Sequence, residues 1–115
     1  MKMKLSKLVE SLHYECLSKG VPLDTDVEGA YVSDLLSDVM GKAEKGMVWI
    51  TSQVHKNIVA VASLKELSAI IVVNERAVSR EVRELADSEG VILLSSGKPA
   101  FETAGALYAL LHAEI

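Results

Sequence analysis

Cysteine and long apolar runs are almost missing from this sequence. Cys16 is its one cysteine, so no disulfide can form within the chain, and such usage is typical of a reducing compartment. Met1 and Lys2 begin a basic start, but polar residues follow at once and no signal peptide is expected. No stretch approaches the roughly 20 apolar residues that cross a bilayer. We therefore expect a soluble cytoplasmic protein that does not associate with membranes.

Basic and aromatic residues are also scarce. Twelve Lys and Arg residues stand against 16 Asp and Glu, which gives a net charge of -4, and no basic stripe is visible. Binding to nucleic acid phosphates needs a basic face, so nucleic acid is not expected as a partner. Aromatic residues make up only 4% of the chain, whereas hydrophobic residues make up 50% and the mean hydropathy is +0.26. This aliphatic composition predicts a packed core and suits parallel strands covered by helices.

Known catalytic and metal-binding motifs are missing as well. The glycine-rich phosphate loops, the GxSxG turn, HExxH and CxxC do not occur. His13, Glu15 and Cys16 have the look of metal ligands, but zinc needs three or four ligands and no further ligand lies nearby in the sequence. We therefore expect no catalytic residue, no metal and no cofactor, and we do not expect an enzyme.

Apolar runs of strand length alternate with segments of helical pattern. The expected strands are residues 14–17, 27–32, 47–51, 69–73 and 91–94. The segments with apolar residues at helical spacing are 5–13, 34–43, 54–65, 80–89 and 99–113. Because parallel strands need crossover connections, this alternation predicts one α/β domain over residues 1–115. Its expected architecture is three α/β/α layers around a mostly parallel sheet of about five strands.

The segment 54–65 fits two patterns. Residues 58–61 suit a strand by propensity. However, Val54, Ile58 and Val61 recur at helical spacing, and two buried parallel strands need a crossover between them. We therefore predict a helix here.

Several residues predict where elements begin and end. Gly29 inside the expected strand 27–32 indicates a bulge or a close approach by another backbone or by a ligand. Gly90 is expected to end a helix. The residues expected to cap helices at their start are Ser6, Ser33, Asp34 and Ser79.

Polar residues collect where the expected strands end, in 33–34, 51–57, 74–76 and 95–98. If the strands are parallel, these clusters share one rim of the sheet, where open α/β folds bind ligands. A helix N-terminus at this rim favours an anion such as a nucleotide. Equally, the same residues can be loop residues and helix caps, and His55 can be a core or interface histidine. The residues expected to face a ligand are Thr51, Gln53, His55, Asn57, Ser33, Asp34 and Arg76.

Four segments carry a resemblance to a known family. They are 29–40, 48–62, 70–74 and 101–108, and the most specific part is Trp-Ile-Thr-x-Gln-x-His-x-Asn in 49–57. With these segments the chain resembles the stand-alone proteins of the DRTGG-domain family, although the Asp-Arg-Thr-Gly-Gly string itself is absent. The resemblance implies a fold similar to the amino-terminal domain of bacterial HPr kinase/phosphorylase. It also implies an accessory, often dimerising domain without an established catalytic activity, of the kind found with CBS pairs in regulated pyrophosphatases.

These observations lead to two hypotheses about function. The first is a regulatory or sensor domain that forms a homodimer and binds a small anionic ligand at the carboxyl-terminal rim. Phe101 and Tyr108 form a second apolar stripe on the final helix, which predicts self-association, and the helix after Asp34 offers another apolar surface. The alternative is a pure protein–protein interaction module whose polar rim only caps helices.

Overall fold

A computed structural model describes residues 3–113, which form a five-stranded sheet and a separate pair of short strands. The strand order in the large sheet is β2-β7-β6-β5-β4. Four strands run parallel: β4 (Ala30–Val32), β5 (Val48–Thr51), β6 (Ala69–Val72) and β7 (Leu93–Ser95). The edge strand β2 (Glu15–Cys16) pairs with β7 in the antiparallel direction. The predicted mostly parallel sheet of about five strands is confirmed.

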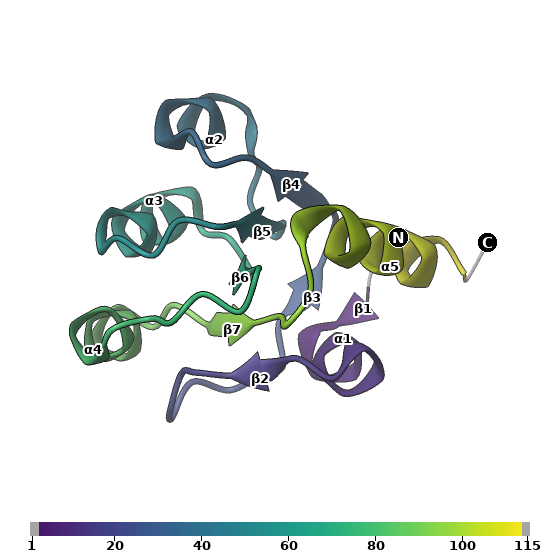
Figure 1. The fold of residues 1–115 in the computed structure, drawn as a ribbon, viewed down its shortest axis with the longest axis horizontal. Coiled ribbons are helices and arrows are strands. Elements are labelled where there is room, and N and C mark those ends of the chain that lie inside the picture. The colour runs from purple at the N-terminus through teal and green to yellow at the C-terminus, as the bar shows by residue number, and fades with distance from the viewer. Residues whose placement is uncertain (1–2, 114–115) are drawn as a thin grey trace.

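Helices cover both faces of this sheet (Figure 1). On one side lie α2 (Leu36–Lys42), α3 (Asn57–Lys65) and α4 (Arg80–Glu89). On the other lie α1 (Leu5–Leu12) and α5 (Ala100–His112). Side chains of β5 point alternately into the two layers, so that Trp49 packs with the first group and Ile50 with the second. The expected α/β/α layering is therefore confirmed.

The ambiguous segment 54–65 forms a helix, as predicted. Within α3, four apolar residues are buried: Ile58, Val59, Val61 and Ala62. The helix lies between α2 and α4 and against the sheet, so it is apolar around most of its circumference (Figure 1). This burial explains why its sequence resembles a strand.

The expected strand 27–32 is instead two strands that belong to different sheets. Gly29 adopts φ +148°, a conformation that is unfavourable for other residues, and the chain changes direction there. Before it, β3 (Asp26–Val27) pairs with β1 (Met3–Lys4) in the antiparallel direction. After it, β4 joins the large sheet. The prediction of a single strand over 27–32, with only a bulge or a close approach at Gly29, was therefore wrong.

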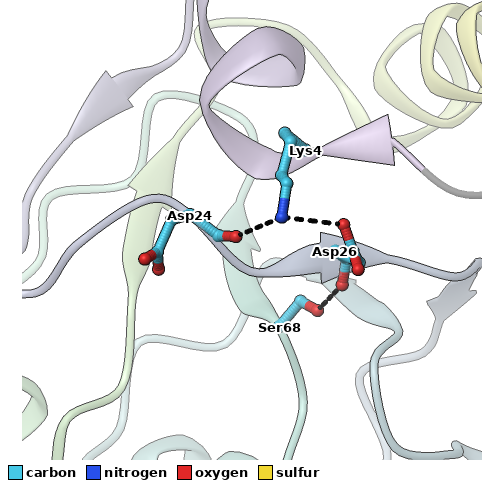
Figure 2. Close-up of polar contacts among 4 residues, drawn as sticks. All are labelled: Lys4, Asp24, Asp26 and Ser68. Carbon is cyan, nitrogen blue, oxygen red and sulfur yellow. Dashed lines mark hydrogen bonds and ion pairs between the residues drawn. The ribbon is translucent and has the colours of Figure 1, made fainter.

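Polar contacts attach the short strand pair to the large sheet (Figure 2). Lys4 Nζ donates to the Asp24 carbonyl at 3.0 Å and pairs with Asp26 Oδ1 at 3.2 Å. The buried Ser68 Oγ donates to the carbonyl oxygens of Asp26 (2.7 Å) and Gly46 (2.9 Å). Ser68 therefore fixes β3 beside the loop that enters β6.

The predicted capping residues have different outcomes. Ser79 caps α4 by accepting a hydrogen bond from the Val82 N–H at 3.3 Å, and Gly90 ends that helix in the left-handed conformation, as expected. Ser6 was a wrong prediction, because α1 begins at Leu5 and its N-cap is Lys4. No helix within residues 3–113 is long and apolar enough to cross a bilayer.

Candidate functional site

The carboxyl ends of four strands form one rim of the sheet. In the parallel register Val32 pairs with Ile50, Thr51 with Val72, and Val72 with Ser95. The loops that follow these strands, and that we call the rim, are 33–35, 52–56, 73–79 and 96–99. The polar clusters of the sequence therefore share one edge, as predicted.

Asp34 connects the first two rim loops. One carboxylate oxygen, Oδ1, accepts hydrogen bonds from Thr51 Oγ1 and from the Ser52 N–H, both at 2.7 Å, and Oδ2 accepts one from Ser52 Oγ at 2.7 Å. The predicted capping roles of Ser33 and Asp34 were both wrong, because the N-cap of α2 is Leu35 and no side chain within residues 3–113 caps this helix. Ser33 Oγ instead accepts a hydrogen bond from the Leu35 N–H at 3.1 Å. Asp34 instead joins the end of β4 to the end of β5.

These bonds determine the ionisation of Asp34. Burial by itself would raise the pKa of the carboxyl, but the hydrogen bonds from Ser52 and Thr51, together with the charge of Arg76, hold the pKa below its ordinary value. Thr51 is 2% exposed and its hydroxyl donates to Asp34, so the hydrogen of this hydroxyl is already engaged in a bond within the protein. The negative charge of Asp34 is thus stabilised by the protein itself.

Four of the predicted ligand-facing residues line one open groove of about 400 Å³ on the β5 side of the rim. They are Asp34, Gln53, His55 and Asn57, and Leu35, Leu36 and Ser37 complete the lining. The first turn of the crossover helix was expected from Gln53 onward, but α3 begins at Asn57. The cause is local, since the Asn57 N–H donates to His55 Nδ1 at 3.1 Å and the loop continues to Lys56.

The other predicted residues lie elsewhere on the rim. Ser33 and Thr51 line a smaller hollow of about 130 Å³, which Asp34 also borders. Arg76 lines a hollow of about 340 Å³ on the β7 side. The structure therefore distributes the predicted set over three hollows.

A further hollow at the rim, of about 520 Å³, was missed as a site by the sequence interpretation. It lies between the end of α1, the β7–α5 loop and α5, and of its lining only Glu75 and residues 96–98 belonged to predicted clusters. Tyr14 lines it, and burial raises the pKa of this phenol to about 12. No spacing in the sequence connects Tyr14 with α5, because the two meet only through the fold.

Comparisons with known proteins support the fold. No protein-family model and no curated protein matches the chain. Among solved structures it is similar to the CBS and DRTGG domains of the regulatory region of Clostridium perfringens pyrophosphatase, complexed with the activator diadenosine tetraphosphate. The TM-score is 0.73 and the sequence identity is 16%. The match covers 90% of this chain and 45% of the other.

This similarity establishes a shared fold, which agrees with the fold that the DRTGG resemblance implied. The chain spans less than half of the length of the pyrophosphatase region that it matches. In the described residues, no group of three His, Cys, Asp or Glu side chains is placed to hold a metal ion.

Proposed function

We propose that this protein is a regulatory domain that binds a small anionic ligand, such as a nucleotide, at its carboxyl-terminal rim. The observation that carries the proposal is the groove of about 400 Å³ at the ends of β4 and β5, because open α/β sheets bind ligands at this edge. The similar solved structure is a regulatory region in complex with a nucleotide activator, which supports the same kind of role here. We also propose that the chain is a stand-alone member of the DRTGG-domain family, which its sequence resembles.

The chemistry of the groove suits a ligand that carries both an anion and a ring. His55 Nδ1 accepts a hydrogen bond from the Asn57 N–H, so Nε2 carries the ring proton and can donate to an anion. Gln53 adds an exposed amide with two N–H donors. Leu35, which is 64% exposed, gives the groove an apolar wall for a ring. Because Asp34 is already bound by three donors, its carboxylate is occupied by the protein.

The proposal includes a homodimer in the cytoplasm and no catalysis by this domain. Phe101 and Tyr108 are 89% and 65% exposed on the outer face of α5. An apolar stripe on a helix that already buries its inner face is typical of a symmetric interface. The similar structure is a regulatory region, which supports a role without chemistry of its own.

The test is binding of AMP, ADP and diadenosine tetraphosphate by calorimetry and thermal shift. A ligand at 100 times its Kd should stabilise the folded protein by about 2.7 kcal/mol. The double variant Gln53→Ala/His55→Ala should lose at least about tenfold in affinity, or about 1.4 kcal/mol. Lys7→Ala, at an exposed position on α1 away from the groove and from the stripe of α5, is the control and should bind as the wild type does.

The exposed Phe101 also favours a second candidate, the pure interaction module. In that case no nucleotide would bind, and the double variant would change only the melting temperature. Failure of all three nucleotides at millimolar concentration, with self-association intact, would make the interaction module the better function.

A further inference from the structure

The hollow of about 520 Å³ lies apart from the proposed groove and shares none of its residues. Its walls come from three parts of the chain: residues 11–14 at the end of α1, Glu75 after β6, and residues 96–106 around the start of α5. Its size falls in the range of about 300–1,000 Å³ that is typical of small-molecule sites.

A polar group in this wall has no partner. The hydroxyl oxygen of Tyr14 is buried, and it forms no hydrogen bond with any of residues 3–113. Buried hydroxyl groups in folded proteins are nearly always paired, so an unpaired one on a residue that lines a hollow calls for an explanation. A ligand that offers an oxygen or nitrogen to this hydroxyl would supply one.

The backbone around the hollow is also unusual. Glu75 borders the hollow and adopts a left-handed conformation with φ 53°, as does Asn74 before it with φ 65°. The left-handed His13 on the other wall is the C-cap of α1, which is a common way for a helix to end. Such conformations in residues other than glycine cluster at binding sites, where the surrounding structure holds them. The Glu75 N–H donates to the Ser96 carbonyl at 3.4 Å, which ties two walls of the hollow together.

The charged side chains of the hollow indicate the chemical class of the ligand. Lys98 offers a cation, whereas Glu75 and Glu102 offer carboxylates that accept hydrogen bonds from hydroxyl groups. The neighbouring hollow of about 340 Å³ shares His13, Glu75 and Gly97 with the first. Its further charged residues are Arg76, Arg83 and one carboxylate, Glu15. Arginine and lysine bind phosphate. The two hollows together therefore suit a molecule with several hydroxyl groups at one end and a phosphate at the other.

We propose that the hollow between α1 and α5 is a second ligand site, which takes a phosphorylated sugar, either free or as the ribose phosphate of a nucleotide. Its hydroxyl groups lie against Glu75 and Glu102, and its phosphate lies toward Lys98 and Arg76. The site does not depend on the groove beside His55, although a nucleotide fits the ligand class of both.

The experiment uses the full chain with four probes: ribose 5-phosphate, AMP, adenosine and inorganic phosphate. Ala106 is exposed on α5 and lines the hollow, so Ala106→Phe fills the site without disturbing the core. Ala109 is exposed on the same helix and borders no described hollow, so Ala109→Phe is the matched control. We expect ribose 5-phosphate or AMP to bind, and Ala106→Phe to weaken that binding by at least about tenfold. Ala109→Phe should leave it unchanged.

Tyr14→Phe separates a ligand role from a structural one. Removing the unpaired hydroxyl should raise the melting temperature of the free protein and at the same time weaken the bound probe. Ribose 5-phosphate and AMP carry both a sugar and a phosphate. The one that fits the site should therefore bind more tightly than adenosine or inorganic phosphate. Binding of ribose 5-phosphate but not AMP would identify a free sugar phosphate, and the reverse would identify a nucleotide.

Three results would overturn the inference. The first is that no probe binds at millimolar concentration. The second is that a probe binds equally well to wild type and Ala106→Phe. The third is that every probe that binds loses its binding in the Gln53→Ala/His55→Ala variant but keeps it in Ala106→Phe, in which case the proposed function stands and the second site does not exist.

Discussion

At the scale of single residues, Asp34 is the side chain that makes the rim a connected unit. Its three hydrogen bonds to Thr51 and Ser52 hold the loop after β4 against the loop after β5. The groove beside His55 is built on these two loops. The shape of the proposed site therefore depends on one ionised carboxylate.

We expect Asp34→Asn to destabilise the fold by about 1 kcal/mol. An asparagine keeps one oxygen acceptor but turns an N–H₂ group toward a donor, so at least one bond is lost. The residue is exposed, which keeps the cost at the low end of the usual range. Urea unfolding measures it. Asp24→Asn is the control, because the Asp24 carboxylate accepts no hydrogen bond from residues 3–113 (Figure 2), and it should stay within about 0.5 kcal/mol of wild type.

Acid should weaken the fold through the same residue. The pKa of Asp34 in the folded protein lies below its ordinary value of 3.8, so the unfolded chain binds this proton more readily than the folded one. The stabilisation is complete above pH 3.8 and is lost as the pH falls through the folded pKa. Asp38 acts in the same direction, since the hydrogen bond from Tyr31 holds its pKa down. Between about pH 5 and 3, Asp34→Asn should therefore lose less stability than wild type, and parallel curves would contradict this.

At the scale of elements, much of the fold follows from the sequence because local pattern and topology agree. The helix 54–65 was predicted correctly against strand propensity, since β5 and β6 are parallel and need a crossover. The capping role of Asp34 was mispredicted because its partners lie far along the chain: Thr51 ends β5 and Ser52 begins the loop after it. Residue type shows that a side chain can cap, but only the fold shows which groups it meets. For the same reason the spacing of residues along the sequence did not predict the hollow beside Tyr14.

The division between β3 and β4 depends on one glycine. At φ +148° an alanine in place of Gly29 should destabilise the fold by about 1–2 kcal/mol, because a side chain is unfavourable in this backbone conformation. A steric clash adds nothing, since the new Cβ would meet only Met47, at an ordinary 3.7 Å. Gly41 in α2 is the matched control, since a Cβ there meets nothing within 4 Å. Gly41→Ala should stabilise the protein by about 0.5–1 kcal/mol. Thermal unfolding of both variants checks the opposite signs, and equal effects would refute the role of Gly29.

At the scale of the whole molecule, the exposed stripe of α5 predicts how two copies meet. Tyr108 stacks on His112 with ring centroids 4.0 Å apart, and Phe101 extends the same face. We expect sedimentation to show a dimer for wild type and a monomer for Phe101→Glu, because a buried charge without a partner opposes association. Leu64→Glu is the control: Leu64 is 73% exposed on α3, on the opposite side of the sheet (Figure 1), and this variant should remain dimeric. A wild type that stays monomeric at high micromolar concentration would rule out the dimer.

The pairing of β2 with β7 has a consequence for how the protein is made. Glu15 pairs with Ser95, and Ser18 Oγ donates to the Val91 carbonyl at 3.0 Å and accepts from the Leu93 N–H at 2.6 Å. Residues 15–18 are synthesised before β7, so they find these partners only once β7 has been made. The inner face of α1 packs against α5, so this apolar face also stays without its partner until α5 has been made. We expect protease to cleave residues 5–18 in ribosome-bound chains that end before β7, and to spare them once α5 has emerged.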